Sequence, residues 1–357
     1  MKEHLMGSPC PDRPGLAPVS AAQFFTGQRV VVTGAAGFIG SHMCERLIQF
    51  GANVVGVDNL VTGSLDNLAG LSREAAFELI MADVTVPFSV TGPVHTVLHL
   101  ASPASPRDYL RLPVETLMTG AMGTLHALQL AQARNARFLL ASTSEVYGDP
   151  LVHPQHEQYW GNVNSVGPRS VYDEAKRYAE ALTASFRRDG GTDTAIARIF
   201  NTYGPRMRPG DGRAVPAFIG QALAGELLTV AGDGSQTRSL CYVSDTVEGL
   251  LALAASAHAG PVNIGNPQEI SMLELARLVR ERCAAASPIT FVELPVDDPQ
   301  RRCPDISLAR RLLGWQPHVD LADGLAATVY AAATAASGTP GALLRAGAAR
   351  AATGVRS

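Results

Sequence analysis

The sequence has little of what a secreted, membrane-spanning or nucleic-acid-binding protein needs. Five cysteines occur among 357 residues, an odd number, and no two of them have the CxxC spacing. This pattern favours a reducing compartment over a disulfide framework or a zinc site. The net charge is −3, which provides no long-range field for nucleic acid or an anionic membrane, and no apolar run of about 18 residues occurs. We therefore expect a cytoplasmic protein with no metal, nucleic-acid or membrane partner.

The two ends of the chain also lack the pattern of folded segments. Residues 1–27 contain prolines and charges but no continuous apolar stretch of the kind a signal peptide requires. Residues 336–357 are rich in alanine, glycine and arginine and show no apolar periodicity. We predict a disordered leader and a disordered tail at these positions.

Between the ends, short apolar runs alternate with helical patterns. The runs are RVVVTG, NVVGVDN, VHTVLHLAS, ARFLLAST and TAIARIFN, and they are rich in Val, Ile and Leu rather than alternating with polar residues. Such runs are typical of parallel strands that are covered by helices on both faces. This predicts an α/β fold, a Rossmann-type doubly wound parallel sheet over 28–203, with 239–266 packing back on it. A smaller C-terminal substrate domain is expected over 204–335.

A glycine-rich turn follows the first apolar run. Gly34, Gly37 and Gly40 form a GxxGxxG spacing between a strand and a helix, where glycines allow close backbone approach to a pyrophosphate. The next strand ends in Asp58, where a carboxylate would bind the ribose hydroxyls of NAD and repel a 2′-phosphate. The alternative is a glycine-rich turn beside a surface aspartate. Asp83 and Val84, at the end of another apolar run, are candidates for contact with adenine.

A second pattern points to chemistry at the same edge of the sheet. Tyr172 and Lys176 are four residues apart in a helical pattern, so the ammonium can lower the phenol pKa and hold a cofactor ribose. Residues Ser142 to Tyr147 supply hydroxyls and a carboxylate directly after another strand, where open α/β sheets bind ligands. A solvated tyrosine and lysine on a helix are the alternative.

These motifs carry a resemblance to a known family. TGAAGFIG, STSEVYG, YDEAK and ARIFNTYGPR resemble the extended short-chain dehydrogenase/reductase family, whose members act on nucleotide sugars. Longer segments resemble the UDP-glucuronic acid decarboxylases within it, in order and with similar gaps, from about residue 29 to 330. These segments are DNLVTGSLDNL, HLASPASPRDY, LLASTSEVYGDPLVHPQ, GPRSVYDEAKRYAE, ARIFNTYGPRMRPGDGR, GDGSQTRSLCYVSD and PDISLARRLLGWQP.

The resemblance implies a reaction and a role for each matching residue. Tyr172 would take the proton of the sugar 4-hydroxyl while NAD accepts the C4 hydride, helped by Thr143 and Lys176. The 4-keto sugar would lose carbon dioxide from C5, with Glu145 as the candidate acid or base. Arg302 would bind the sugar carboxylate. The hydride would then return to C4 and give UDP-xylose.

Further positions complete the predicted sites. The resemblance places Arg238 at the diphosphate, Asn201 near the sugar and Ser144 at the carboxylate. Arg206 and Arg213 are each either a nucleotide clamp or solvated, and Arg213 is the better candidate. Arg302 could instead be one of several exposed arginines in a basic turn. The residues assigned to the cofactor are Gly34, Gly37, Phe38, Ile39, Gly40, Asp58, Asn59, Thr62, Gly63, Asp83, Val84, Leu100, Ser102, Thr119, Tyr172 and Lys176.

One departure from the family pattern stands out. Met118 occupies a position where the family has a lysine that reaches the substrate, so a positive partner for the carboxylate is lost. It could also be a core methionine of a shifted helix. By family analogy, 123–135 and the helix containing Tyr172 would form a homodimer interface.

Three other classes of protein would share part of this pattern with a decarboxylase. A UDP-sugar 4-epimerase would share the cofactor site, Tyr172 and Lys176 but would not need a carboxylate-binding Arg302. A 4,6-dehydratase would need an acid where this chain has Ser144. A non-catalytic dinucleotide sensor would not need an intact Thr143, Tyr172 and Lys176. An enzyme that releases the 4-keto sugar also fits the change at Met118.

Overall fold

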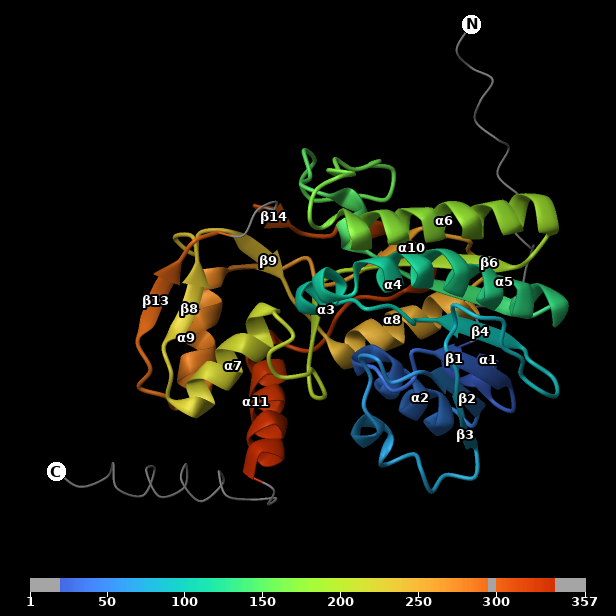
Figure 1. Cartoon of the computed structure of the whole chain (residues 1–357), viewed down its shortest axis with the longest axis horizontal. Helices are drawn as coiled ribbons and strands as arrows, with labels where there is room; N and C mark the ends of the chain where they lie inside the picture. The colour runs from blue at the N-terminus through green and yellow to red at the C-terminus, as the bar shows by residue number, and fades with distance from the viewer. Residues whose placement is uncertain (1–19, 295–299, 338–357) are drawn as a thin grey trace, which may run out of the picture.

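The computed structural model describes residues 20–294 and 300–337. A parallel seven-stranded sheet of order β11-β6-β5-β4-β1-β2-β3 lies at its centre (Figure 1). Its strands are β1 (Arg29–Thr33), β2 (Asn53–Asp58), β3 (Phe77–Met81), β4 (Thr96–His99), β5 (Arg137–Thr143), β6 (Thr194–Ile199) and β11 (Val262–Ile264). The strand order reverses beside β1, which pairs with both β2 and β4, and this is the point where open sheets of this kind bind ligands. The predicted Rossmann-type sheet is confirmed.

The apolar runs form this sheet because both of its faces are buried. Val30 and Val32 of β1 pack into one core, and Val31 between them packs into a second core on the opposite face. Neighbouring strands repeat this arrangement, since Val31 is aligned with Val55 of β2 and with Val97 of β4. Continuous apolar strands are therefore what both cores require.

Helices cover both faces of the sheet (Figure 1). The first core includes residues of α1 (Ala21–Phe25), α2 (Phe38–Gln49), α8 (Val243–Ala255) and α10 (Ser307–Leu313). The second includes residues of α5 (Thr124–Ala133) and α6 (Ser170–Gly190). The short α3 (Pro106–Arg111) and α4 (Pro113–Met118) precede a π-helical turn at Thr119–Gly123 and pack against α6.

The prediction of a disordered leader through residue 27 is wrong for residues 20–27. Ser20 caps α1 in a capping box with Gln23, and Phe25 is fully buried in the first core. One aromatic anchor in a short helix gave too weak an apolar pattern to be read from the sequence. The predicted tail begins too early by two residues, because 336 and 337 belong to helix α11, Leu321–Ser337. The rest of the predicted leader and tail lies outside the described residues.

A smaller unit stands beside the sheet, to the left in Figure 1. Its core joins helices α7 (Ala214–Ala224), α9 (Met272–Arg282) and α11 (Leu321–Ser337) with β8 (Leu228–Ala231). Strand β8 pairs with β13 (Ile289–Val292), while β9 (Thr237–Ser239) lies between β12 (Glu269–Ser271) and β14 (Arg301–Arg302). Two short strands, β7 (Thr202–Tyr203) and β10 (Cys241–Tyr242), pair where the chain passes between the two units.

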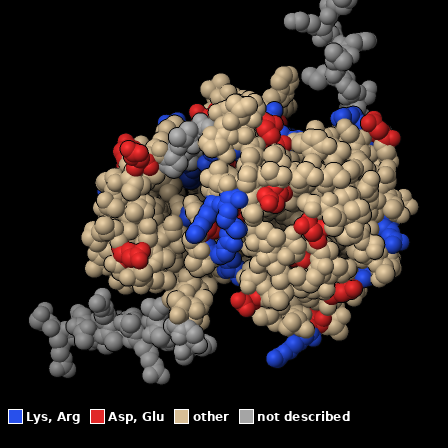
Figure 2. Space-filling view, in the orientation of Figure 1, with Lys and Arg blue, Asp and Glu red and all other residues tan. Residues whose placement is uncertain are grey.

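The two units enclose one large cavity. Figure 2 shows basic side chains gathered along a groove between them, and the arginines that line the cavity include Arg206, Arg208 and Arg213. Among the helices of the described residues, none combines the length and apolar character needed to cross a bilayer.

Candidate active site

The turn between β1 and α2 leaves room for a ligand to approach the backbone. Gly34 has φ +73°, and a Cβ at this position would lie 2.8 Å from the Ala101 amide nitrogen. A Cβ on Gly40 would lie 2.0 Å from the Gly34 carbonyl oxygen, so side chains at either position would force the backbone apart. Gly37 caps α2 without a side chain, which leaves the first amides of the helix available to an anion. This cradle fits the pyrophosphate of a dinucleotide.

Asp58 lies at the carboxyl end of β2, beside this turn. Its carboxylate accepts hydrogen bonds from the Ala36 amide at 2.9 Å and the Leu60 amide at 2.8 Å. Burial raises the pKa of Asp58, and the amide donors oppose that rise. An acceptor fixed at this strand end suits the ribose hydroxyls of NAD. Asn59, next in the chain, donates to Asp83 at 3.1 Å, so two of the predicted cofactor contacts are joined.

Tyr172 and Lys176 lie on one face of α6, which points into the cavity. The Lys176 ammonium donates to the Ala141 carbonyl oxygen at 2.8 Å and lies 5.8 Å from the centre of the Tyr172 ring. Burial lowers the pKa of Lys176 to about 8, with Glu180 acting in the opposite direction. Burial also raises the pKa of Tyr172, and a hydrogen bond with Thr143 offsets only part of that rise. Desolvation thus sets the direction of the Tyr172 pKa in the chain alone, and the lowering of that pKa by Lys176 stays a prediction.

Glu145 lies between two arginines at the wall of the cavity. It belongs to a 3-10 turn, Ser144–Tyr147, that Thr143 caps by accepting from the Glu145 amide at 3.2 Å. Arg169 donates to one carboxylate oxygen at 2.8 Å, and Arg302 donates to the other. Burial acts to raise the pKa of Glu145, but the two arginines lower it to about 2. Glu145 is therefore ionised at neutral pH.

Arg302 is buried rather than solvated. It is 2% exposed, and it also donates to the Gly148 carbonyl oxygen at 2.8 Å, whereas the neighbouring Arg301 is exposed. One nitrogen of its guanidinium, Nε, is buried without a hydrogen-bond partner in the structure. The alternative of an exposed basic turn fails for Arg302, and its position at the cavity wall leaves it able to meet an anionic ligand.

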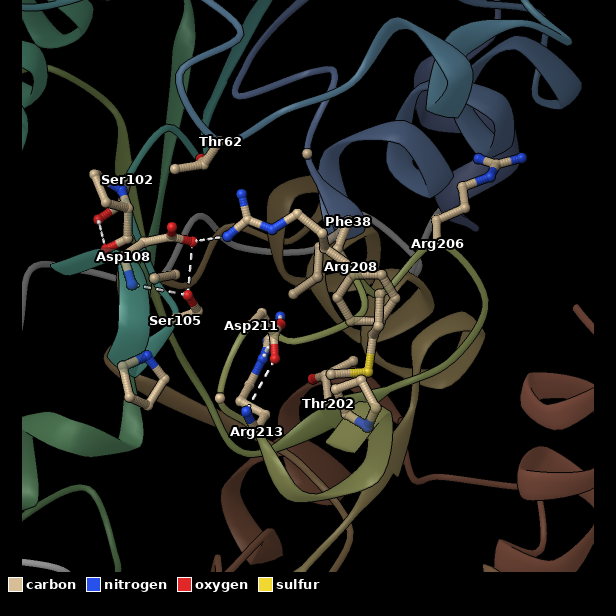
Figure 3. Close-up of a pocket in the computed structure, with 18 of the residues that line it drawn as sticks. Phe38, Thr62, Ser102, Ser105, Asp108, Thr202, Arg206, Arg208, Asp211 and Arg213 are labelled. Atoms are coloured by element: carbon tan, nitrogen blue, oxygen red, sulfur yellow. Dashed lines mark hydrogen bonds and ion pairs between the residues drawn. The ribbon is translucent and has the colours of Figure 1, made fainter. Parts of the chain in front are cut away.

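The loop of residues 204–213 brings further arginines to the cavity (Figure 3). Arg213 is paired with the buried Asp211, to which its Nε donates at 2.8 Å. Arg206 is paired with Glu45 of α2 and its side chain is 26% exposed, so it is only partly solvated, and its role as a nucleotide clamp stays a prediction. Burial of the Asp211 carboxylate explains why the Arg213 side chain turns back along its own loop.

All the residues that the sequence assigns to cofactor, substrate or catalysis line the same cavity, which has a volume of about 1410 Å³. Asn201 lines it from the connection between β6 and β7, and Arg238 lines it from β9. Met118 ends α4 and is 43% exposed at the cavity, so it is not the core methionine of a shifted helix. Within residues 20–294 and 300–337, no three His, Cys, Asp or Glu side chains are grouped to hold a metal ion.

Two residues of the site were not assigned from the sequence. The Tyr109 ring stacks on the Tyr172 ring with centroids 5.2 Å apart and planes 6° apart, and its side chain is buried. Arg169 shares Glu145 with Arg302. Both lie inside segments that resemble the family, HLASPASPRDY and GPRSVYDEAK. Nothing in their spacing, however, shows that this tyrosine and this arginine reach the site, which only the fold reveals.

Comparison with known proteins agrees with this geometry. Residues 30–265 match the model of the NAD dependent epimerase/dehydratase family. UDP-glucuronic acid decarboxylase 6 of Arabidopsis thaliana is 54% identical over 311 residues, which is 87% of this chain and 90% of the plant protein.

Two solved structures share the fold at lower identity. UDP-glucose 4-epimerase from Thermotoga maritima, solved with UDP-glucose, is 29% identical with a TM-score of 0.80, covering 87% of this chain and 100% of its own. UDP-glucuronic acid 4-epimerase from Bacillus cereus, in complex with UDP-glucuronic acid and NAD, is 28% identical with a TM-score of 0.76, covering 85% and 98%.

Proposed function

The chain belongs to the NAD-dependent epimerase/dehydratase family, and from this premise we propose that it is a UDP-glucuronic acid decarboxylase that forms UDP-xylose. The reaction oxidises C4 of the sugar, releases carbon dioxide from C5 and reduces C4 again. The observation that carries the proposal is the placement of Glu145 and Arg302 beside Tyr172 in one cavity, in a chain 54% identical to such an enzyme.

The cofactor is NAD, which when bound accepts the C4 hydride and later returns it. Gly34, Gly37 and Gly40 hold its pyrophosphate, and Asp58 holds its adenosine ribose. Lys176, fixed by the Ala141 carbonyl and 5.8 Å from the centre of the Tyr172 ring, would hold the second ribose of the cofactor.

Tyr172 acts as the base that takes the proton of the sugar 4-hydroxyl. Burial raises the pKa of its phenol in the chain alone, so the proton must leave the sugar hydroxyl as the hydride leaves C4 and the phenol must be supported by its neighbours. Thr143, which interacts with the phenol, orients the hydroxyl, and the Lys176 ammonium favours the anion. The stacked Tyr109 ring fixes the plane of the base.

Carbon dioxide leaves because a ketone at C4 makes the C5 carboxylate part of a β-keto acid. The electron pair of the broken bond passes into an enolate, which is then protonated at C5. Arg302 binds the substrate carboxylate, for which it must share its guanidinium with Glu145. C5 takes its proton from a water molecule that donates a hydrogen bond to Glu145, which is ionised and held by Arg169. The proton released by the 4-hydroxyl neutralises the hydroxide that is left, and Ser144 orients the substrate carboxylate.

Substrate binding beyond the sugar involves the smaller unit. Arg238 on β9 and Arg213 at the start of α7 bind the nucleotide diphosphate, and Asn201 contacts the substrate near the sugar. Arg213 would bind phosphate oxygens with the donors of its guanidinium that its pair with Asp211 leaves available. In this division, 28–203 with 239–266 binds the cofactor and 204–335 binds the UDP-sugar.

We also propose a homodimer in the cytoplasm, with α5 and α6 facing a second copy. Tyr178 on α6 is 53% exposed, and such an exposed aromatic side chain suits a self-complementary interface. The cysteines of the described residues are unpaired, which fits a reducing compartment. Tyr178→Asp should shift the chain from dimer to monomer in analytical ultracentrifugation; an unchanged mass would remove α6 from the interface.

A direct assay distinguishes the decarboxylase from a 4-epimerase. Purified protein saturated with NAD and given UDP-glucuronic acid should release one carbon dioxide for each UDP-xylose. A 4-epimer formed without carbon dioxide would overturn the proposal. The matched variants Arg302→Ala and Arg301→Ala separate the buried arginine from its exposed neighbour, and Arg302→Ala alone should impair turnover of glucuronate.

A further inference from the structure

The loop of residues 204–213 crosses from one wall of the cofactor cleft to the other. On the α2 side, the His42 ring contacts the Pro205 carbonyl oxygen at 3.0 Å, and Arg206 pairs with Glu45 at 2.5 Å. The guanidinium of Arg213 at the far end of the loop lies 5.8 Å from the centre of the Phe38 ring, at the start of α2. The loop is therefore attached to the helix whose N-terminus faces the pyrophosphate.

On the opposite wall the same loop is tied to α3. Arg208 forms an ion pair with Asp108, whose side chain is 6% exposed, and Arg107 donates to the Gly210 carbonyl oxygen at 2.9 Å. Ser105 donates to the same Asp108 carboxylate at 2.6 Å and fixes its direction. Figure 3 shows Arg208 extending from the loop toward Asp108 and Ser105.

Both partners of this ion pair line the cavity, together with residues assigned to the cofactor. The ion pair is also unlike a surface pair, because one of its members is buried. Burial acts to raise the pKa of Asp108, but the Ser105 hydroxyl and Arg208 lower it, so the carboxylate is charged at neutral pH. A charged group that closes the α3 side of the loop has no role in the chemistry derived above.

We infer that the Asp108–Arg208 pair is a latch that holds the loop of residues 204–213 over bound NAD and sugar, and that it determines which product leaves. The inference rests on the proposed function. While the latch is closed, the 4-keto sugar and NADH remain together and C4 is reduced again. When the latch is lost, the 4-keto sugar and NADH leave before C4 is reduced again, and the chain becomes an enzyme that releases the 4-keto pentose.

Release of the 4-keto sugar and NADH before C4 is reduced again is chemically balanced. UDP-glucuronate and NAD⁺ give the UDP-4-keto-pentose, carbon dioxide and NADH. The C4 hydride reduces NAD⁺, and the proton lost from the 4-hydroxyl is matched by the proton gained at C5. Each released keto sugar therefore leaves one NADH, which absorbs at a wavelength where NAD⁺ does not.

The test compares variants of two arginines that share the Asp108 carboxylate. Arg208 reaches it across the cleft, whereas Arg111 approaches the other oxygen at 3.4 Å from within α3. The side chains of Arg208 and Arg111 are 43% and 59% exposed, so replacing either should leave the fold intact. The parent chain and four variants are each loaded with NAD, and the NAD they release is trapped by an excess of a second dehydrogenase. The variants are Arg208→Met, Arg208→Glu, the conservative Arg208→Lys and the control Arg111→Met.

We expect Arg208→Met to release NAD roughly five- to tenfold faster than the parent chain, and Arg208→Glu faster still, because it adds repulsion by Asp108. With UDP-glucuronic acid, both should form more NADH and keto pentose per UDP-xylose, while Arg111→Met and Arg208→Lys remain near the parent. Equal NAD release by Arg208→Met and Arg111→Met would overturn the latch. The release rate does not depend on decarboxylation, so absence of carbon dioxide from the parent chain would overturn the proposed function separately.

Discussion

Replacing Arg302 with methionine should destabilise the chain by leaving a buried carboxylate with one counter-charge fewer. The Arg302 and Glu145 side chains are 3% and 15% exposed. Burial opposes ionisation of Glu145, yet its pKa is lowered from 4.5 to about 2, which corresponds to about 3 kcal/mol at neutral pH. Both arginines lower this pKa, and the charge of Arg302 is the largest single contribution in that direction. The free energy of unfolding at pH 7, measured by urea denaturation, should therefore fall by about 2–3 kcal/mol.

The pH dependence and two control variants test the cause of this loss. A lowered pKa contributes stability that is present above pH 4.5 and is lost as the pH falls toward 2, so the parent and the variant should converge over that range. The exposed Arg301→Met should change stability little. Glu145→Gln combined with Arg302→Met should cost less than the sum of the single changes. Additive losses, or equal stability of the Arg302 and Arg301 variants, would refute the buried pair as the cause.

Three further predictions concern the cofactor and the base. Tyr172→Phe should bind NAD as tightly as the parent in a fluorescence titration but form no NADH with UDP-glucuronic acid; residual turnover would rule out Tyr172 as the base. Lys176 is charged below a pKa of about 8, so kcat/KM should fall as the pH rises through 8, and this alkaline fall should be missing from the residual activity of Lys176→Met. Asp58→Asn removes the charge that repels a 2′-phosphate, so the ratio of the Kd values for NADP and NAD should drop about tenfold. An unchanged ratio would place another group at the ribose.

The sheet and the cofactor turn could be predicted from the sequence because their signals are local. A strand buried on both faces needs a continuous apolar run, and the turn after β1 needs glycine where a Cβ would strike Ala101 or Gly34. Asp58 can be predicted from the apolar run and the glycine turn together, because it is the last residue of the strand that comes after the turn. These requirements concern residues that are close together in the chain, so they can be recognised in the sequence without knowledge of the fold.

The rest of the site depends on contacts between distant segments. Glu145 and Arg302 are 157 positions apart, and Asp108 and Arg208 are 100 positions apart. Neither pair has a spacing that sequence alone could recognise, and each joins the sheet unit to a loop or strand of the other unit. The raised pKa of Tyr172 could not be read from the sequence for a related reason, because desolvation depends on everything packed around the phenol.

Deuterium at C4 of the substrate tests the central claim most directly. UDP-glucuronic acid labelled with deuterium at C4 should give carbon dioxide and UDP-xylose that retains the deuterium at C4, with unlabelled NADH present in the medium. Retention would show that one bound cofactor carries the same hydride out and back. UDP-xylose with hydrogen at C4, or unchanged UDP-glucuronic acid with no carbon dioxide, would contradict the account.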